Sequence, residues 1–273
     1  MIILPPTVPS VPTGMAAAGS GIPPRLSREA SGPVRFARYA YGPNALGYCG
    51  PDESAELFAQ ATAGVEQPVL RRLASQFEGA FPYLELIARA NGLADPLDAR
   101  VVEAYWLGND LLTAVTPRLL GDSLDVRFRR RLRADGWRWL AGKPLAGALP
   151  MHAFHVLDVF PRLGLIRSGS IDRVLEVIDS CRVRWGRVLE RDGDALVVSA
   201  VPLALVDGRL ALAHPRVERI RGWRDGAGFV DGAAPGEAVS IHWDWACEVL
   251  DARRLAALQS WTARELEIAN QTI

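Results

Sequence analysis

The first half of the chain carries apolar residues at three- and four-residue spacing, the pattern of amphipathic helices packed on a core. The segments with this pattern have Pro near the first position, acids in the first turn, or Gly and Asn-Gly at the end. The spacing predicts helices over residues 51–64, 67–92 with a break or kink at Pro82, 95–115, 123–142 with a strongly basic face, and 150–164.

The second half changes to β-type runs after a short helix over 170–180, which Ser170 is expected to cap. These runs cover residues 181–190, 195–206, 209–220 and 237–246, and the Asp-Gly pairs between them are typical of hairpin turns. The chain closes with an amphipathic helix over 251–271 that begins after Asp251, a good capping residue.

These elements predict an α+β fold: an N-terminal helical bundle followed by a small antiparallel β-sheet and a C-terminal helix. Residues 1–32 are rich in Pro, Gly, Ser and Ala, and we expect a disordered N-terminal extension there, with Met15 as an alternative translation start. Residues 33–166 then form the helical domain, and residues 167–273 form the antiparallel sheet with flanking helices, packed on the helical domain.

Charge and composition exclude several classes of function. The 31 basic and 31 acidic residues cancel, so we expect no nucleic-acid binding. The N-terminus lacks a basic segment before its apolar residues, and no apolar run is long enough to span a bilayer, so we expect no signal peptide and no membrane insertion. Three cysteines make a poor disulfide framework and favour the cytoplasm. Phosphate-binding Gly-rich loops, dinucleotide fingerprints, serine-hydrolase elbows and kinase motifs are absent from the sequence.

Cys49 stands before Gly50 and Pro51, directly in front of the first predicted helix. A thiol at a helix N-terminus is favoured as thiolate, so Cys49 is a candidate nucleophile or metal ligand. The alternative is an inert thiol packed under a turn that Gly and Pro would build anyway. Cys181 opens a predicted strand and faces the core, which favours a packed thiol.

The segment 240–247, "SIHWDWAC", alternates polar and apolar residues as a single half-buried strand does. Alternation places His242 and Asp244 on one face, where a carboxylate would orient an imidazole for general-base catalysis or metal binding. It also places Cys247 on the opposite face, away from His242. The alternative is a solvated polar strand face.

The segment "HAFH" places His152 and His155 three residues apart on a predicted helix, close enough to approach one ion. The alternative is a pair of packed histidines. Together with Cys49 and His242 they form a candidate metal-ligand set. Such ligands suit zinc, copper, nickel or iron, whereas no acidic loop resembles a calcium site.

Five segments in order, "ARYAYGPNALGYCGP", "PLDARVVEAYWLGN", "HAFHVLDVFPRLG", "CRVRWG" and "SIHWDWAC", resemble an uncharacterised bacterial family found chiefly in actinobacteria. The resemblance covers about Arg35 to Asn270. It implies an association with gene clusters for [NiFe]-hydrogenase production, and hence an accessory or maturation role with a metalloenzyme subunit or maturation factor as partner. It supplies no catalytic residues. Met151 stands where the family has a second histidine, which weakens a metal site in this segment.

Three hypotheses remain open. The first is a cytoplasmic accessory protein that binds a metal or metal-site precursor in a cleft lined by Cys49, His152, His155 and His242. The second is a cysteine-dependent transferase or hydrolase with Cys49 as nucleophile, His242 as base and Asp244 orienting it. The third is a non-catalytic interaction module that binds through its basic helix.

Overall fold

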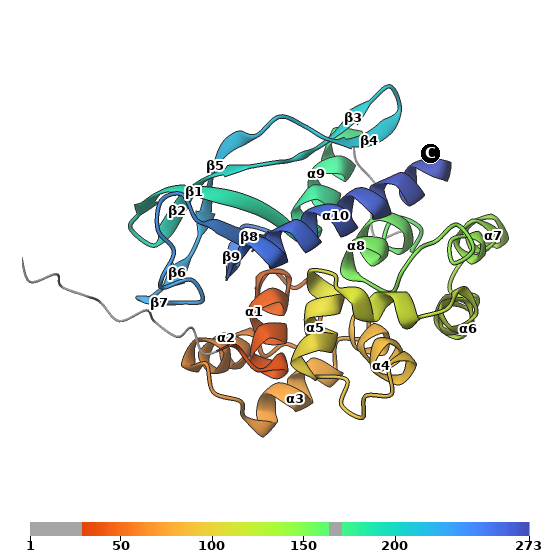
Figure 1. Cartoon of the computed structure of the whole chain (residues 1–273), viewed down its shortest axis with the longest axis horizontal. Helices are drawn as coiled ribbons and strands as arrows, with labels where there is room; N and C mark the ends of the chain where they lie inside the picture. Colours follow the sequence, from red (N-terminus) through yellow and green to blue (C-terminus); the bar gives the residue numbers. More distant parts are fainter. Residues whose placement is uncertain (1–28, 164–170, 273) are drawn as a thin grey trace, which may run out of the picture.

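The computed structural model describes residues 29–163 and 171–272 and confirms the mixed α+β class. Helices occupy one side of the molecule and strands the other, with the C-terminal helix along the junction (Figure 1). Residues 1–28 of the predicted N-terminal extension over 1–32 lie outside the described residues, as does the predicted cap Ser170. The end of that extension is wrong, because Gly32 is buried and opens helix α1. No helix within the described residues is both long and apolar enough to cross a membrane.

The helical part is built from short helices whose apolar faces meet in one core. The helices are α1 (Gly32–Ala45), α2 (Ser54–Ala63), α3 (Pro68–Ser75), α4 (Phe81–Ala90), α5 (Ala99–Trp106), α6 (Pro117–Phe128), α7 (Ala134–Gly142), α8 (His152–Phe154) and α9 (Ile171–Cys181), with a 3₁₀ turn η1 (Asp110–Ala114) and a π-helical turn η2 (His155–Val159). Side-chain caps from Asp98 and Thr116 begin α5 and α6.

Helix α1 is absent from the prediction because its sequence carries Gly32, Pro33, Gly42 and Pro43, which are poor helix formers. Tertiary packing overrides that preference, since almost the whole helix is buried. Gly42 is required by a close approach: a Cβ atom there would lie 2.8 Å from the carbonyl oxygen of His242. Helix α1 thus reaches the strand that carries His242.

Other helix boundaries differ from the prediction in informative ways. Helix α2 begins at Ser54 rather than at Pro51. The long segment divides at Pro82 as predicted, giving α3 and α4. The predicted basic helix over 123–142 is instead two helices, α6 and α7, joined by a turn. The "HAFH" segment is one turn of α-helix continued as a π-turn, in which the Phe160 amide donates to the His155 carbonyl oxygen.

The strands are β1 (Arg184–Asp192), β2 (Ala195–Ala200), β3 (Leu203–Val206), β4 (Arg209–Leu212), β5 (Arg216–Arg221), β6 (Trp223–Arg224), β7 (Ala227–Gly228), β8 (Ala238–His242) and β9 (Trp245–Leu250). Five of them close into a barrel in the order β1-β2-β5-β9-β8. The pairs are antiparallel except β5 with β9, which are parallel. Because β8 returns to lie beside β1, the strands β8, β1, β2 and β5 form a Greek key.

The predicted single strand over "SIHWDWAC" is wrong. Strand β8 ends at His242, Trp243 and Asp244 form a two-residue turn, and β9 begins at Trp245. Trp243 has φ 58°, a backbone conformation that usually selects Gly, Asn or Asp, so its sequence gives no turn signal. The Asp-Gly turns at residues 192–193, 207–208 and 225–226 do lie where the sequence predicts hairpins.

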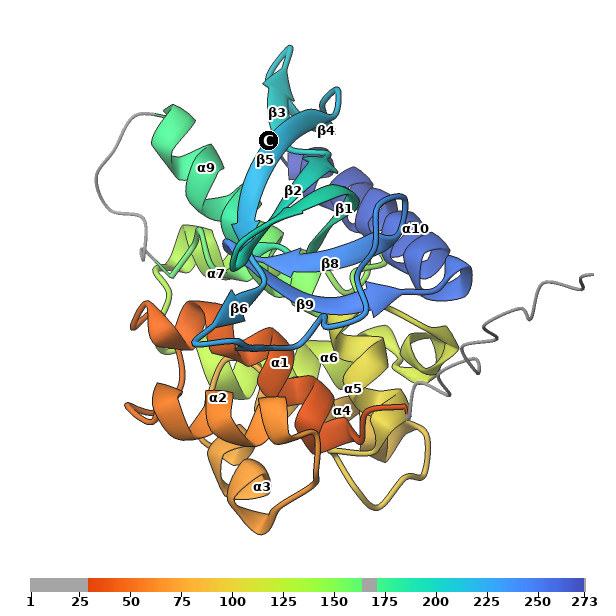
Figure 2. The ribbon, with the colours of Figure 1, turned by 90° about the vertical axis from the view of Figure 1, so that its left-hand side faces the viewer.

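The bundle and the barrel share an extensive contact. Helix α10 (Ala252–Ala269), followed by a 3₁₀ turn η3 (Asn270–Thr272), begins after its predicted cap Asp251 and packs on α8, β1, β4 and β9. Strands β8 and β9 lie above α1 (Figure 2). The bundle core continues into the junction through Trp245 and Cys247, while Val198, Val239 and Ile241 fill the barrel interior.

A buried ion network fastens α1 to β9. The Arg35 guanidinium donates to both carboxylate oxygens of Glu248, at 3.2 and 3.1 Å, and the Tyr39 hydroxyl donates to Glu248 at 3.1 Å. The Tyr39 hydroxyl also forms a 2.9 Å hydrogen bond with Ser240. Glu103 joins through Arg35 at 3.7 Å and receives hydrogen bonds from Arg253 and Arg254 at the start of α10. These residues are called the Glu248 network below.

Candidate functional site

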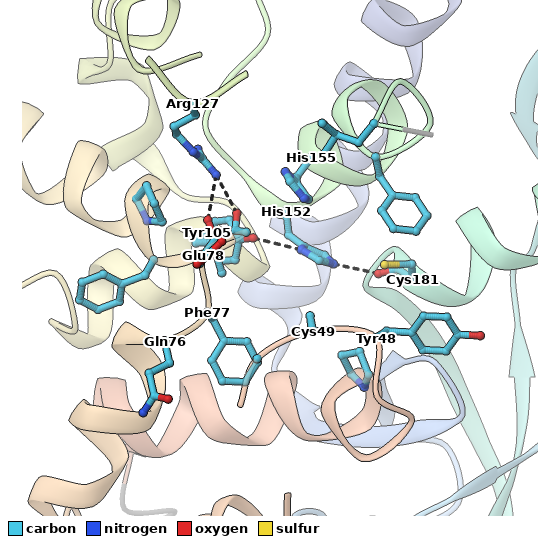
Figure 3. A pocket seen from close by; sticks show the side chains of 18 of the residues that line it. Tyr48, Cys49, Gln76, Phe77, Glu78, Tyr105, Arg127, His152, His155 and Cys181 are labelled. Carbon is cyan, nitrogen blue, oxygen red and sulfur yellow. Dashed lines mark hydrogen bonds between the residues drawn. The ribbon is translucent and has the colours of Figure 1, made fainter. Parts of the chain in front are cut away.

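A cavity of about 860 Å³ opens at the junction of the helical part and the barrel. Its walls come from the loop after α1, the α3–α4 connection, α5, α6, the α8–η2 segment, the end of α9 and the turn after β8. All four sequence-predicted metal ligands, Cys49, His152, His155 and His242, line this one cavity. Figure 3 shows the first three of them. Its size is typical of a small-molecule site.

Three side chains in the cavity come close together: His152 from α8, Cys181 at the last residue of α9, and His242 at the end of β8. One ligand atom from each lies within 4.8 Å of the others. The two imidazole rings are 4.8 Å apart between centroids and nearly perpendicular. We call these three residues the His-Cys group. Cys49 and His155 line the same cavity but do not belong to it.

One ring nitrogen of His242 is hydrogen-bonded to the backbone, and the other has no hydrogen-bond partner among the described residues. Its Nδ1 lies 2.6 Å from the Tyr39 carbonyl oxygen, and since a carbonyl only accepts, Nδ1 must carry the proton. Nε2 therefore carries the lone pair, and this buried atom has no hydrogen-bond partner among the described residues. Burial lowers the pKa of His242 to about 4, so the ring is neutral near pH 7. A backbone-held imidazole with a free lone pair is the usual form of a metal-binding histidine.

His152 uses both nitrogens already. Nε2 lies 2.8 Å from the Cys181 carbonyl oxygen and must donate to it, which leaves Nδ1 to accept from the Tyr105 hydroxyl at 3.2 Å. Burial and then the neighbouring His242 lower the pKa of His152 well below its usual value. The ring is neutral, as a ligand must be, but one of its two hydrogen bonds has to give way before it can bind an ion.

Cys181 is the site residue that sequence reasoning missed. The predicted strand beginning at Cys181 is wrong, because the residue ends α9 and β1 begins only at Arg184. The half-buried thiol consequently lines the cavity instead of a strand face in the core. Burial raises the pKa of Cys181, so the thiol is protonated in the absence of a cation. A bound metal ion reverses this preference, because it stabilises the thiolate directly.

Cys49 lies on an exposed loop between α1 and α2, across the cavity from His155 (Figure 3). The Asn44 amide shapes the loop by donating to the carbonyl oxygens of Cys49 and Pro51. Because α2 begins at Ser54, Cys49 is not at a helix N-terminus, and the expected thiolate stabilisation is absent. Although the residue as a whole is exposed, desolvation of its thiol by burial raises the thiol pKa to about 12. This corrects the electrostatic argument for Cys49 as a nucleophile.

His155 occupies the far end of the cavity, where the α-helical turn becomes the π-turn. Its Nδ1 lies 3.3 Å from the Tyr83 hydroxyl. Burial, and then the positive charge of Arg127, lower the pKa of His155 to about 3. The π-turn therefore separates the two histidines of "HAFH": His152 joins the His-Cys group, and His155 faces Arg127.

Asp244 does not orient His242. The turn at Trp243 and Asp244 leaves Asp244 exposed, where it forms a 2.9 Å ion pair with Arg221. The part predicted for Asp244, a hydrogen-bond acceptor for the His242 ring, is taken by the Tyr39 carbonyl oxygen. The predicted Cys49–His242–Asp244 arrangement is thus not present as a hydrogen-bonded unit in the described part of the chain.

The donor set of the His-Cys group fits a soft or borderline metal ion. In a tetrahedral site with metal–ligand bonds near 2.0–2.3 Å, the ligand atoms lie roughly 3.5 Å from one another. The ligand atoms of the His-Cys group lie within 4.8 Å of one another, so the side chains would move together by about 1 Å on binding an ion. A fourth position would face the cavity, where a water molecule or a ligand can bind. Open sites with three protein ligands are typical of catalytic or transfer centres rather than structural ones.

Comparison with known proteins identifies the family of this chain but gives no information about its activity. No curated protein and no solved structure matches the chain. One family model does match, over residues 28–273, a range that contains all of the described structure and every residue of the cavity. The protein therefore belongs to DUF6390, a family of unknown function.

Proposed function

We propose that this protein binds a transition-metal ion through His152, Cys181 and His242, with an open coordination position facing the cavity. The observation that carries the proposal is the buried His242 ring. Its Nε2 has no hydrogen-bond partner among the described residues, and one of its nitrogens lies within 4.8 Å of a ligand atom from each of His152 and Cys181. Leaving such a nitrogen unpaired in a protein interior costs free energy, and a metal ion is the partner that its neutral state and fixed tautomer suit.

The biological role we propose is that of a cytoplasmic accessory or maturation protein, which holds a metal or metal-site precursor for another metalloenzyme. The mixed imidazole and thiolate donors support zinc, nickel or iron rather than magnesium or calcium. The open cavity beside the group supports a transfer role, because a buried four-ligand site would not release its ion readily. The link to [NiFe]-hydrogenase rests on the sequence resemblance alone.

The test is metal analysis of untagged protein purified without oxygen, followed by titration of the metal-free protein with Zn²⁺ and Co²⁺. We expect one ion per chain and, with Co²⁺, a thiolate-to-cobalt absorption band that is lost in Cys181→Ser. His242→Gln should weaken binding strongly, because loss of one of three ligands removes most of the site.

Two cysteines give matched controls. Cys49→Ala removes a thiol that lines the cavity outside the His-Cys group, and Cys247→Ala removes a buried thiol elsewhere. Both variants should keep the cobalt band. A band lost in Cys49→Ala but retained in Cys181→Ser would contradict the assignment, as would metal binding that survives both Cys181→Ser and His242→Gln.

A second function is favoured by the same observation. The free Nε2 of His242 is also the acceptor that a Cys181 thiol needs for activation, with the Tyr39 carbonyl orienting the ring. In this form of the cysteine-dependent transferase or hydrolase, the nucleophile is Cys181 instead of Cys49. Reaction of metal-free protein with iodoacetamide separates the two functions: a rate at Cys181 that falls in His242→Gln supports the thiol–imidazole pair, and an inert Cys181 excludes it.

A further inference from the structure

The cavity has a second polar end that the metal proposal does not use. Arg127, near the end of α6, lines the cavity together with His155 from the π-turn. In Figure 3 these two side chains enter from the side opposite Cys49 and Tyr48, and His152 lies between the two sides. The positive charge of Arg127 lowers the pKa of His155, which shows that the two groups interact electrostatically.

The Arg127 guanidinium is held firmly but its charge is not neutralised. Nη2 donates to the carbonyl oxygens of Glu78 and Gly79, at 3.3 and 3.1 Å. The guanidinium carbon lies 4.1 Å from the ring centroid of Tyr83 and 4.7 Å from that of Phe128. No carboxylate of the described residues forms an ion pair with it, and Nη1 is buried without a hydrogen-bond partner. Two carbonyl oxygens and two aromatic rings thus fix the position of the Arg127 guanidinium, which has no carboxylate partner among the described residues.

His155 supplies a second donor beside it. The Tyr83 hydroxyl lies 3.3 Å from Nδ1. If that hydroxyl donates, the neutral ring carries its proton on Nε2 and can donate from there. Arg127 and His155 thus place two N–H donor groups on the same part of the cavity wall. Around these donors, Phe77, Phe81, Phe128 and Phe160 make the cavity wall largely aromatic.

We propose that the cavity binds a small organic carboxylate with an apolar or aromatic body, and that its carboxylate lies between the guanidinium of Arg127 and Nε2 of His155. A charge-assisted hydrogen bond from a preorganised guanidinium is among the stronger polar contacts in proteins. The aromatic wall accommodates the apolar body, and the far end of such a ligand would point toward the His-Cys group. The proposal does not depend on a bound metal, and it is tested on metal-free protein.

The experiment follows binding of acetate, benzoate and indole-3-acetate to EDTA-treated protein by calorimetry and by NMR of the histidine rings, in buffer free of phosphate and sulfate. We expect benzoate and indole-3-acetate to bind more tightly than acetate, and the uncharged analogue benzyl alcohol to bind at least about tenfold more weakly than benzoate. Bound carboxylate should also raise the pKa of His155, because it offsets the charge of Arg127.

Arg127→Gln should weaken benzoate binding about tenfold or more, whereas Arg129→Gln, on the exposed end of the same helix, should leave it unchanged. If Arg127→Gln does not fold, His155→Gln serves as the second variant and should also weaken binding. The proposal is overturned if none of the three carboxylates shifts the His155 resonances, or if benzyl alcohol binds as well as benzoate. Metal binding that persists after either result leaves the His-Cys group intact as a separate site.

Discussion

The Glu248 network and the His-Cys group lie next to each other beneath β8, and they differ in how completely their polar atoms are paired. In the network, Arg35, Tyr39 and Ser240 surround Glu248 with hydrogen bonds. In the His-Cys group, Nε2 of His242 has no partner within the described residues. Tyr39 connects the two, since its hydroxyl belongs to the network and its carbonyl oxygen holds His242.

The difference separates a structural cluster from a candidate binding site. Buried charges are retained in a fold when every one is paired, because an unpaired charge is strongly destabilising. Although burial by itself would raise the pKa of Glu103, hydrogen bonds from Arg253 and Arg254 lower it to about 2, which keeps the Glu103 carboxylate ionised. A group that is incompletely paired contributes less to stability and is available for a ligand. The predictions below test this contrast.

The largest effect should come from breaking the network. Arg35→Leu removes the guanidinium that donates to both oxygens of the buried Glu248 carboxylate and leaves only Arg254, at 3.7 Å, so we expect the free energy of unfolding to fall by roughly 3–5 kcal/mol. Urea unfolding followed by circular dichroism measures this change. Arg100→Leu is the control, since its ion pair with Asp98 is exposed and worth at most about 1 kcal/mol. Similar losses in both variants would contradict the structural role of the network.

The second effect is the pH dependence contributed by His242. The folded-state pKa of His242 is about 4, below the usual histidine pKa of 6.5, so the unfolded chain takes up a proton first as the pH falls. The stability that the neutral ring contributes is complete above about pH 6.5 and is lost between there and about pH 4.

The difference in unfolding free energy between metal-free wild type and His242→Gln should therefore fall by on the order of 3 kcal/mol from pH 7 to pH 4. Taking the difference removes the opposing contribution of Asp158, whose pKa burial raises to about 6. Unfolding curves at four or five pH values measure it. A pH-independent difference would mean that His242 is not desolvated.

The third effect is stabilisation by metal. At a free Zn²⁺ concentration one hundred times the dissociation constant, binding to the folded state alone raises the unfolding free energy by about 2.7 kcal/mol. We expect this increase in the wild type and in Cys49→Ala, and its loss in Cys181→Ser. Thermal unfolding with and without Zn²⁺ measures it, and an equal increase in Cys181→Ser would place the metal elsewhere.

The smallest effect should come from Asp244. Its ion pair with Arg221 is exposed, so Asp244→Ala should change the unfolding free energy by less than about 1 kcal/mol and leave Co²⁺ binding unchanged. The matched variant Tyr39→Phe keeps the carbonyl that holds His242 and should also keep Co²⁺ binding. Loss of cobalt binding in Asp244→Ala alone would contradict this expectation and support the predicted interaction between His242 and Asp244.

The fold class and many of the helices and hairpins could be predicted because periodicity and turn residues are local signals. Helix α1 could not, since burial against α2, α3 and α5 and against β8 and β9 offsets its prolines and glycines. His152 and His242 could be selected from their residue type and the spacing or strand face on which they lie. Cys181 could not, because a shift of the strand start from residue 181 to 184 decides whether it faces the core or the cavity. Asp244 was misplaced because a Trp adopts the left-handed turn conformation that ends β8.

The three residues of the His-Cys group come from segments that are distant in the sequence, and this affects the order in which the group assembles during folding. Helix α8, the end of α9 and the end of β8 lie far apart in the chain, and His242 is held by Tyr39, about 200 residues earlier. Contacts of such long sequence separation form late, after the local helices. During synthesis the helical part alone therefore lacks His242, and the ligand set that we propose is assembled only once the barrel has closed.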